Sequence, residues 1–409
     1  MIHVIEEANR CLQCKRPMCM EGCPIKTPIP MMIKALREGR VKEAGSFVFE
    51  NNPLSVVCSL VCDHQAQCEG HCVLARRGDG IHISSIENYI SDSSLDKMKI
   101  ECAPKNGHMV AVIGAGPAGI TIAIEMTKMG YDVTIFDAKD RIGGVLQYGI
   151  PEFRLPKSIL DRYRKKLLEI GVKIRPNTTI GGALEIKDLF RDGYKAIFIG
   201  TGVWRPKKLG VVGESLGNVH FAIDYLANPS SYELGKNIAI IGGGNTAMDV
   251  ARTIIRSGDH NVTLYLRRNV VEASEEEKEY ALLDGANIEY CMGIRRITPE
   301  GPIFIKNIVN EEGKIIGTEG EEFLVPADQT FIAVSQGPKS KLVDTTEGLK
   351  AGPSGLLITS DDGETTCPGI FAAGDVVLGA KTVVQATSYA KRVAKSMDKY
   401  IRSLEEKKD

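Results

Sequence analysis

Cysteines are concentrated near the start of the chain, in a spacing that suits metal binding. Eight of the 11 cysteines lie in the first 72 residues, as C-x2-C-x4-C-x3-C-P followed by C-x3-C-x5-C-x3-C. They are Cys11, Cys14, Cys19, Cys23, Cys58, Cys62, Cys68 and Cys72. The N-terminus MIHVIEEANR lacks the basic and apolar regions of an export signal, so metal is favoured over a disulfide framework. Four thiolates suit Zn²⁺ and iron–sulfur clusters equally well.

A glycine-rich turn opens the first of two dinucleotide-binding patterns. Gly114-Ala115-Gly116-Pro117-Ala118-Gly119 follows the apolar run MVAVI and precedes the helical pattern ITIAIEMTKMG. Glycines here permit a tight turn, close approach of a pyrophosphate, and packing of the helix on the strand. Asp137 ends the next apolar run, where an acid would bind ribose hydroxyls. This loop is therefore predicted to bind a dinucleotide.

A second glycine-rich pattern of the same kind follows about 125 residues later, and the strand after it ends in basic residues. GGGNTAMDVAR follows the run NIAII, and the next strand pattern, VTLYL, ends in Arg267-Arg268. Guanidinium groups suit a 2′-phosphate, so we predict NADPH here and FAD at the first loop. The predicted NADP-binding residues are Gly242, Gly244, Asn245, Thr246, Asp249, Arg267 and Arg268. In the alternative interpretation, the two arginines form a solvated strand edge.

Further FAD-binding residues are predicted outside the first loop. Gly374-Asp375 follows a short apolar strand, and a long helix begins near Val383, whose N-terminus could stabilise negative charge on the flavin. In the alternative, purely structural interpretation, Asp375 is a turn or capping residue. With the first loop and Asp137, the predicted FAD set includes Gly144, Leu146, Gly149, Ile150, Thr201, Gly202, Gly374, Asp375, Thr382 and Val383.

The elements that position these residues indicate an α/β chain behind a helical N-terminal region. We predict two Rossmann-like domains, with the NAD(P) domain inserted into a discontinuous FAD domain. The predicted order is a helical iron–sulfur domain at 1–105, the first FAD-binding segment at 106–234, the NAD(P)-binding domain at 235–335, and the second FAD-binding segment at 336–409. A polar, non-periodic stretch at 92–107 is predicted to be a linker.

Composition excludes several classes of partner. The 409 residues carry 51 Lys and Arg against 52 Asp and Glu, a net charge of −1, which argues against nucleic acid or anionic membrane as a partner. No apolar run approaches the ~20 residues that span a bilayer. Cys102, Cys291 and Cys367 are isolated, and none forms the C-x-x-C pair of a dithiol reductase. A cytoplasmic enzyme is expected.

The choice between zinc and iron–sulfur depends on the flavin. The first quartet is similar to the ferredoxin C-x2-C-x2-C-x3-C-P run, whose fourth Cys ligates a second cluster. A flavin domain also needs a centre that accepts electrons one at a time, and zinc does not do so because it has no redox chemistry. We therefore predict iron–sulfur clusters.

The motifs together resemble one family along nearly the whole chain. They are the two Cys runs, ENNPLSVVCSLVC, GAGPAG, GGVLQYGIPEFRLP at 143–156, GTGVWRPKKL, GGGNTAMDVAR and FAAGDVV. The chain resembles the family of the glutamate synthase small (beta) subunit. That family includes the N-terminal half of dihydropyrimidine dehydrogenase, its separate bacterial subunit, and the large subunit of NADH-dependent ferredoxin:NADP oxidoreductase.

The resemblance implies two [4Fe–4S] clusters and a ligand set for each. One would take Cys11, Cys14, Cys19 and Cys72. The other would take Cys23, Cys62 and Cys68, with Glu87 of ISSIE as its fourth ligand and Cys58 as a non-ligand. In the alternative interpretation, Glu87 is a surface glutamate on a helix with no role in metal binding. Two departures from the family are the short segment before Cys11 and Ser335, where relatives usually have a glycine.

We predict an NAD(P)H-oxidising flavoprotein subunit in which hydride passes to FAD and single electrons leave through the clusters. No catalytic side chain is expected. The partner would be a larger catalytic subunit or a ferredoxin-type acceptor in a hetero-oligomer, most simply that of glutamate synthase. Alternatives are the NADH-dependent input subunit of dihydropyrimidine dehydrogenase, a bifurcating ferredoxin:NADP oxidoreductase, and a non-catalytic scaffold with relict folds. The last would show broken cofactor loops, whereas both loops are intact.

Overall fold

A computed structural model describes residues 3–406 of the chain. The chain divides into two compact units. The first contains Met1–Leu146, Glu152–Val203 and Pro338–Asp409, and the second contains Gln147–Pro151 and Trp204–Gly337. The four domain boundaries inferred from the sequence stay a prediction.

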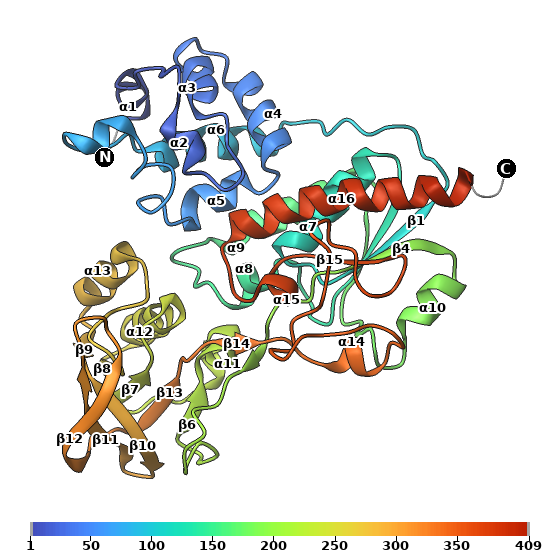
Figure 1. Ribbon diagram of the computed structural model, residues 1–409. Helices are drawn as coiled ribbons and strands as arrows, with labels where there is room; N and C mark the ends of the chain where they lie inside the picture. The colour runs from blue at the N-terminus through green and yellow to red at the C-terminus, as the bar shows by residue number, and fades with distance from the viewer. Residues whose placement is uncertain (1–2, 407–409) are drawn as a thin grey trace. The chain divides into compact units, whose positions relative to one another are not determined.

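The N-terminal region of the first unit is helical (Figure 1). Its helices are α1 (Val4–Asn9), α2 (Met18–Glu21), α3 (Ile29–Arg37), α4 (Val41–Asn51), α5 (Ser55–Val61) and α6 (Ile83–Leu95), with a 3₁₀ turn at Val73–Arg76. Apolar residues at helical spacing on α3 and α6, such as Ile33 and Ile90, are fully buried in one core. α6 continues to Leu95, so the linker prediction was wrong at its start. Leu95 extends the buried stripe of α6 by one turn, which stabilises the helix past Asp92.

The rest of the first unit is a parallel five-stranded sheet with the order β15-β4-β1-β2-β3. The strands are β1 (Met109–Ile113), β2 (Asp132–Phe136), β3 (Lys173–Arg175), β4 (Tyr194–Ile199) and β15 (Ile370–Ala372). The helices are α7 (Pro117–Lys128), α9 (Lys157–Glu169), α10 (Ile186–Arg191), α14 (Lys341–Asp344), α15 (Asp375–Leu378) and α16 (Val383–Glu406). The short α8 (Val145–Tyr148) has its first two residues in this unit and its last two in the second. Because β15 pairs with β4 across more than 150 residues, the sheet is discontinuous in sequence, as predicted.

The second unit contains another parallel sheet, with the order β6-β13-β7-β8-β9. Its strands are β6 (Val219–Phe221), β7 (Asn237–Ile241), β8 (Asn261–Tyr265), β9 (Asn287–Glu289) and β13 (Gln329–Ile332). Its helices are α11 (Ala222–Ala227), α12 (Asn245–Ser257) and α13 (Glu275–Asp284), with a 3₁₀ turn at Pro229–Ser231. An antiparallel sheet joins β10 (Met292–Thr298), β11 (Gly301–Val309) and β12 (Ile315–Leu324), and β5 (Arg205–Pro206) pairs with β14 (Gln336–Gly337). The predicted α/β fold class, with two Rossmann-like sheets, is confirmed.

The position where relatives usually have glycine adopts a backbone conformation that favours glycine. Ser335 has a φ of 79°, in the left-handed region that L-residues rarely occupy. The Ser335 carbonyl accepts a hydrogen bond from the Lys207 N–H at 3.1 Å, which helps to hold this turn beside β5. Ser335 therefore occupies a turn in a backbone conformation that glycine adopts more readily.

Polar contacts attach the helical region to the sheet of the first unit. The Arg162 guanidinium on α9 pairs with the Asp92 and Asp96 carboxylates at the end of α6. On α16, the Lys391 ammonium donates to the Asn51 carbonyl at 2.9 Å, and the Ser388 hydroxyl donates to the Pro24 carbonyl at 3.2 Å. The helical region therefore packs on the elements α9 and α16. Among residues 3–406, no helix combines the length and apolar content needed to cross a membrane.

Candidate functional site

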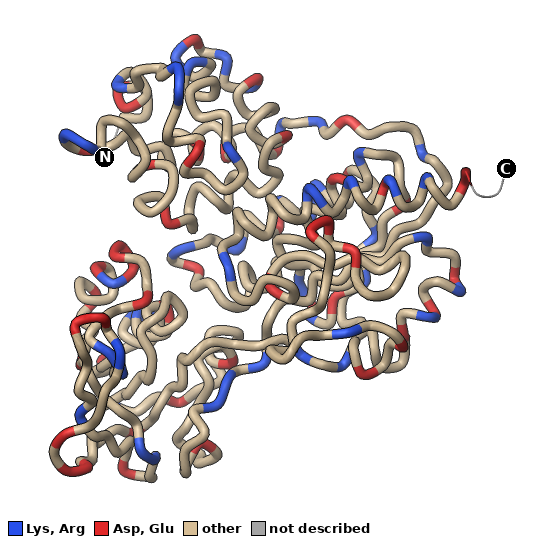
Figure 2. Tube along the Cα trace, viewed as in Figure 1, with Lys and Arg blue, Asp and Glu red and all other residues tan. Residues whose placement is uncertain are grey.

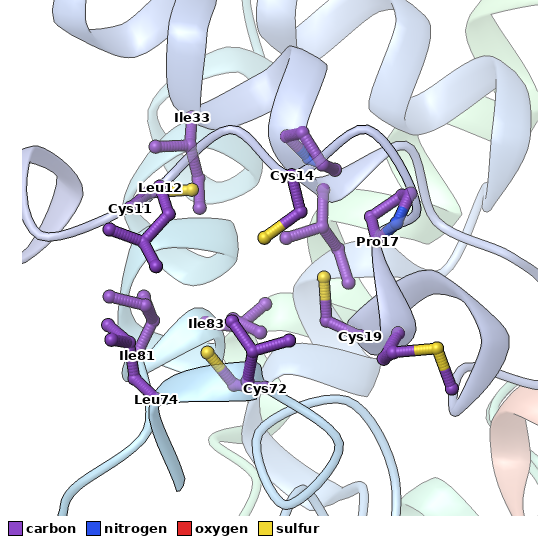
Figure 3. A pocket seen from close by; sticks show the side chains of 14 residues that line it. Cys11, Leu12, Cys14, Pro17, Cys19, Ile33, Cys72, Leu74, Ile81 and Ile83 are labelled. Carbon is purple, nitrogen blue, oxygen red and sulfur yellow. The ribbon is translucent and has the colours of Figure 1, made fainter. Parts of the chain in front are cut away.

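Four of the predicted cluster ligands border a single cavity in the helical region. Cys11, Cys14 and Cys19 come from the turns around α2, and Cys72 comes from a segment more than 50 residues later. In Figure 3 their sulfur atoms surround the same space, which is otherwise bounded by apolar side chains such as Ile33 and Ile83. We call this cavity the first cysteine site. It joins Cys72 to the first three cysteines, as the family's ligand set implies.

The spacing of these thiols around the cavity bears on the choice of metal. A zinc ion needs four ligand atoms within about 2.3 Å of one point. Among residues 3–406, no three Cys, His, Asp or Glu side chains converge in that way. The four sulfurs instead border one shared cavity, an arrangement that fits a polynuclear iron–sulfur cluster.

Burial affects the protonation of a thiol at this site. Burial, followed by the nearby Cys72 thiol, raises the pKa of Cys19 to about 11. A ligand thiol must lose its proton to bind metal, so loading of this site releases protons and is favoured by higher pH.

A second group joins a cysteine from the turn after α2 to residues at the end of α5, in the loop that follows it, and on α6. Burial, followed by the Glu87 carboxylate and then by Glu69 and Cys23, raises the pKa of Cys68 far above its ordinary value. A hydrogen bond with the Cys58 thiol, followed by burial and Glu87, raises the pKa of Cys62. Cys23, Cys62, Cys68 and Glu87 therefore lie close enough to interact electrostatically, and we call them the second cysteine site. Cys58 also lies beside Cys62, so proximity alone does not distinguish this predicted non-ligand from the predicted ligands.

Two buried glutamates near Cys68 differ in how their carboxylates are satisfied. Glu69 is 5% exposed, and its Oε1 accepts hydrogen bonds from the Ser84 N–H at 2.8 Å and the Ser84 hydroxyl at 2.7 Å. Glu87 is 6% exposed, and its Oε1 has no hydrogen-bond partner among the described residues. Burial raises the pKa of Glu87 to about 8. A buried carboxylate without a partner is costly, and a bound iron would satisfy it.

The first glycine loop lies at the carboxyl end of β1, and its glycines have different structural roles. Gly114 has a φ of 101°, and a Cβ on Gly119 would lie 1.9 Å from the Gly114 carbonyl oxygen, so the protein backbone requires both glycines. Gly116 has an ordinary φ of −75°, and its Cβ would contact nothing closer than 3.9 Å. The protein itself leaves room for a side chain at Gly116. That room at the N-terminus of α7 fits the close approach of a pyrophosphate.

Two further predicted segments meet this loop. The Gly143 N–H donates to the Ala115 carbonyl at 2.7 Å, and a Cβ on Gly144 would lie 2.9 Å from Gly116 Cα. From the C-terminal segment, Gly374 lies against Ala118, with a built Cβ 3.1 Å from the Ala118 Cβ. The tertiary structure therefore brings Gly144 and Gly374 to the loop.

Asp137 supports the loop directly. Its carboxylate accepts hydrogen bonds from the Ala115 N–H at 2.6 Å and the Lys139 N–H at 2.7 Å, and burial raises its pKa. The sequence predicted a ribose ligand at this position. In the structure Asp137 already holds the turn between β1 and α7, a second role that sequence reasoning missed.

The remaining predicted FAD residues divide between the two units. Thr201 and Gly202 follow β4 beside Gly114, whose built Cβ would lie 3.1 Å from the Thr201 N. Leu146 is fully buried in the first unit, and its carbonyl accepts a hydrogen bond from Lys157 Nζ at 2.7 Å. Gly149 and Ile150 belong to the second unit. Nothing in the sequence singled out Lys157, because a lysine that begins a helix is common on protein surfaces.

The turn before α16 contains Asp375 and Thr382. The Asp375 Oδ1 accepts from the Lys381 N–H at 3.2 Å, and burial raises the pKa of Asp375 to about 6. At the start of α16, the Thr382 N–H and hydroxyl donate to Gln385 Oε1 at 3.1 and 2.9 Å. Val383 is the first residue of α16, as predicted.

The raised pKa of Asp375 predicts a pH-dependent stability in flavin-depleted protein. The folded state holds the proton to about pH 6, whereas the unfolded carboxyl releases it near 3.8. Stability that is present below pH 4 is therefore lost as the pH rises through 6. We expect Asp375→Asn to raise the free energy of unfolding by about 1–3 kcal/mol at pH 7 and to have little effect at pH 4. Urea unfolding at both pH values measures this difference, and equal effects at both would contradict it.

The second glycine loop lies at the carboxyl end of β7, in the second unit. Gly242 has a φ of 135°, and its built Cβ would lie 2.3 Å from the Ala333 carbonyl oxygen, so the fold requires this glycine. Gly244 precedes α12, has a φ of −88°, and has nothing within 4 Å of its built Cβ. As at the first loop, the middle position is open to a ligand. The buried Ala247 occupies the third glycine position.

The other predicted NADP residues surround this loop or follow β8. Asn245 Oδ1 accepts from the Ser274 N–H at 3.0 Å, Thr246 lies in the first turn of α12, and Asp249 is buried in the same helix. The Arg268 guanidinium pairs with Glu272. Arg267 is exposed and forms no ion pair among those found in the described residues of the chain.

Comparison with known proteins agrees with this geometry. The model of the pyridine nucleotide-disulphide oxidoreductases matches residues 85–193 and 108–392, and that of dihydropyrimidine dehydrogenase domain II, 4Fe-4S cluster, matches residues 2–99. The chain belongs to the pyridine nucleotide-disulphide oxidoreductase family. It is therefore an oxidoreductase of the class that uses FAD and NAD(P)H, with a [4Fe–4S] domain at its N-terminus.

Individual relatives extend over nearly the whole chain. The glutamate synthase [NADPH] small chain of Azospirillum brasilense is 33% identical over 97% of this chain and 89% of its own. The NAD-dependent dihydropyrimidine dehydrogenase subunit PreT of Salmonella typhimurium is 32% identical over 97% of this chain and 94% of its own. The resemblance inferred from the motifs is confirmed.

Solved structures show the same fold at lower identity. Mycobacterium tuberculosis FprA in complex with NADPH aligns with a TM-score of 0.62 and 17% identity, over 74% of this chain and 86% of that one. Lactococcus lactis thioredoxin reductase aligns with a TM-score of 0.58 and 21% identity, over 72% of this chain and 99% of that one.

Proposed function

We propose that this protein is the electron-input subunit of a cytoplasmic hetero-oligomer, similar to the small chain of NADPH-dependent glutamate synthase. It would oxidise NADPH and deliver single electrons to a larger partner subunit. The observation that carries this proposal is the first cysteine site, whose four thiols surround one cavity in the same compact unit as the first glycine loop. An oxidoreductase that only exchanges hydride between nicotinamide and flavin has no need of such a site.

The residues present fit the cofactors of the family. In this proposal the first cysteine site holds one [4Fe–4S] cluster, and the second cysteine site holds the other through three thiolates and the partnerless Glu87 carboxylate. The first glycine loop, with Gly144, Gly374 and Asp375, holds FAD. When bound, these groups convert a two-electron hydride donor into a source of single electrons.

The chain itself sets the order of the two cysteine sites relative to the flavin loop. The Pro24 carbonyl, next to Cys23, accepts a hydrogen bond from Ser388 near the start of α16. On the other side, the fully buried Tyr163 of α9 lies near the Cys58 thiol. The second cysteine site therefore lies against α9 and against α16, the helix whose start belongs to the predicted FAD set. We infer that it receives electrons first and that the first cysteine site delivers them.

The choice between NADPH and NADH depends on the end of β8. Arg268 is already paired with Glu272, so Arg267 is the guanidinium that would meet a 2′-phosphate. We expect Arg267→Ala to raise KM for NADPH by about tenfold, through loss of a charge-assisted hydrogen bond worth about 1.5–3 kcal/mol, with KM for NADH unchanged. Steady-state reduction of a dye measures both. An equal rise in both KM values would show that Arg267 does not bind the 2′-phosphate.

One specific observation favours a second candidate, the NADH-dependent input subunit of dihydropyrimidine dehydrogenase. The identity of the PreT relative to this chain is 32%, against 33% for the Azospirillum brasilense glutamate synthase chain. The alignment with PreT is 403 residues long, whereas that with the glutamate synthase chain is 434 residues long. A bifurcating ferredoxin:NADP oxidoreductase uses the same cofactor sites.

The test is to purify the chain anaerobically and to measure iron, sulfide, zinc and flavin. NADPH and NADH are then compared as donors, and the purified large subunit of glutamate synthase is compared with that of dihydropyrimidine dehydrogenase as the acceptor. Zinc without sulfide, or a chain without flavin, would contradict the proposal. Reduction of only the dehydrogenase subunit would favour the second candidate.

A further inference from the structure

The first cysteine site is bordered at the surface by exposed apolar side chains. Leu12 and Met18 line the cavity and are 62% and 39% exposed. We call Leu12 and Met18 the apolar rim. Large apolar side chains grouped around one opening are typical of a protein contact surface.

Charged residues that are close in sequence to those lining this cavity are mostly basic, although the whole chain carries a net charge of −1. Five basic and two acidic residues lie within two positions of a residue that lines the cavity. They are Arg10, Lys15, Arg16, Lys34 and Arg76, against Glu21 and Asp79. Along the rest of the trace the two signs are interspersed (Figure 2).

Three of these basic residues are not neutralised by a neighbour. Arg10 pairs with Glu7, and Lys34 lies 4.0 Å from Glu38. Lys15, Arg16 and Arg76 are exposed and form no ion pair among those found in residues 3–406. We call these three residues the basic rim. A second copy of this chain would place like charges together, so the surface favours an acidic partner.

The second cysteine site is mostly buried. Cys23, Cys68 and Glu87 are each at most 9% exposed, Cys62 is partly buried, and the site packs against α16 and α9. Electron tunnelling slows steeply with distance, so electrons leave a protein most readily from the centre nearest its surface. The first cysteine site meets that condition.

We propose that the apolar rim and the basic rim together dock the electron-accepting protein. The matching surface of that partner is an apolar patch bordered by Asp and Glu, next to the partner's own redox centre. The apolar contact supplies affinity, and the charges orient the encounter and raise its rate. This inference rests on the proposed function and names the region of the chain that performs its last step.

The test uses two haem proteins of opposite charge as probes, cytochrome b5, which is acidic, and cytochrome c, which is basic. Binding to immobilised holoenzyme is measured at low and high ionic strength, together with the NADPH-dependent reduction rate of each probe. We expect Lys15→Glu with Arg16→Glu to weaken cytochrome b5 binding about tenfold at low salt and to strengthen cytochrome c binding. Leu12→Ser should weaken cytochrome b5 binding at both salt concentrations.

The matched control is Lys97→Glu with Lys99→Glu, an equal charge change at exposed positions beyond α6 that do not line the cavity. Equal effects of the two double variants would overturn the docking proposal, as would cytochrome b5 binding that the Lys15 and Arg16 changes leave unaltered. Iron, sulfide and flavin content is measured for every variant. A wild-type protein that lacks iron and reduces neither probe would contradict the proposed function instead.

Discussion

Replacing Cys72 by alanine is expected to remove about half of the bound iron and to block electron delivery to a protein acceptor. Cys72 reaches the first cysteine site from a segment far from the other three thiols, so its loss leaves the cavity with three ligands. Even changes outside the immediate ligands of a metal site cost about 10- to 100-fold, so we expect acceptor reduction to fall on the order of 100-fold or more. Bleaching of the flavin by NADPH should change little, because that step precedes the cysteine sites.

Cys58→Ala is the matched control. Cys58 is 3% exposed, belongs to the same cysteine-rich region, and lies beside the proposed ligand Cys62. We expect the variant to keep its iron and sulfide, with a modest loss of stability from the small cavity it creates. Iron and sulfide analysis with electron paramagnetic resonance of the reduced protein separates the two variants. Loss of a cluster in Cys58→Ala would instead make Cys58 a ligand.

Substitution of Glu87 distinguishes the two cysteine sites in the same spectroscopic experiment. Glu87→Ala should affect only the second cysteine site, so its reduced spectrum should retain the signal that Cys72→Ala removes. A spectrum identical to that of the wild type would show that the carboxylate is not a ligand. The Glu69 carboxylate, which Ser84 already satisfies, should tolerate Glu69→Gln with little change in iron content.

Gly116→Val is expected to fold like the wild type and to bind FAD weakly. The position has an ordinary φ, and a Cβ there would meet no protein atom closer than 3.9 Å, so the backbone tolerates a side chain. The added side chain would occupy the space that the pyrophosphate needs. Steric crowding of about 1–3 kcal/mol corresponds to a loss of FAD affinity on the order of 10- to 100-fold. Flavin content after purification and titration with FAD both measure this loss.

Two other glycines provide the comparison for Gly116→Val. Gly119→Val should prevent folding of this region of the sheet, because its Cβ would lie 1.9 Å from the Gly114 carbonyl oxygen. Gly217→Ala, where nothing lies within 4 Å of the built Cβ, should leave flavin content unchanged. Normal FAD binding by a folded Gly116→Val protein would show that the ligand does not approach this position.

The two glycine-rich turns could be predicted because their information is local. A glycine pattern between an apolar strand and a helix specifies a turn, a helix N-terminus and the residues beside it within about 25 positions. The structure places both loops at the carboxyl ends of parallel strands, with the middle glycine of each open. The role of Asp137 in bonding the Ala115 N–H could not be predicted, because it depends on the pairing of β1 with β2.

Other features depend on contacts between residues far apart in the chain. The polar composition of 92–107 predicted a linker, but burial of Leu95 in the helical core extends α6. The composition of such a segment reflects its exposed polar residues. It does not reveal that a single apolar residue, here Leu95, packs into the core and extends the helix. The attachment of the helical region through Arg162, Lys391 and Ser388 likewise had no signal in the sequence.

By itself the sequence determined which chemistry the chain can support. Thiolate type and spacing indicated metal, two glycine patterns indicated two dinucleotides, and the motifs together identified the family. The resemblance implied that Cys72 joins Cys11, Cys14 and Cys19, and the tertiary structure brings them to one cavity. Only the tertiary structure showed that Glu87 Oε1 is buried without a partner among the described residues, whereas Ser84 satisfies Glu69 Oε1. The physical reason is that ligand type is a property of single residues. Whether a buried group finds a partner depends on the packing of segments that are distant in sequence.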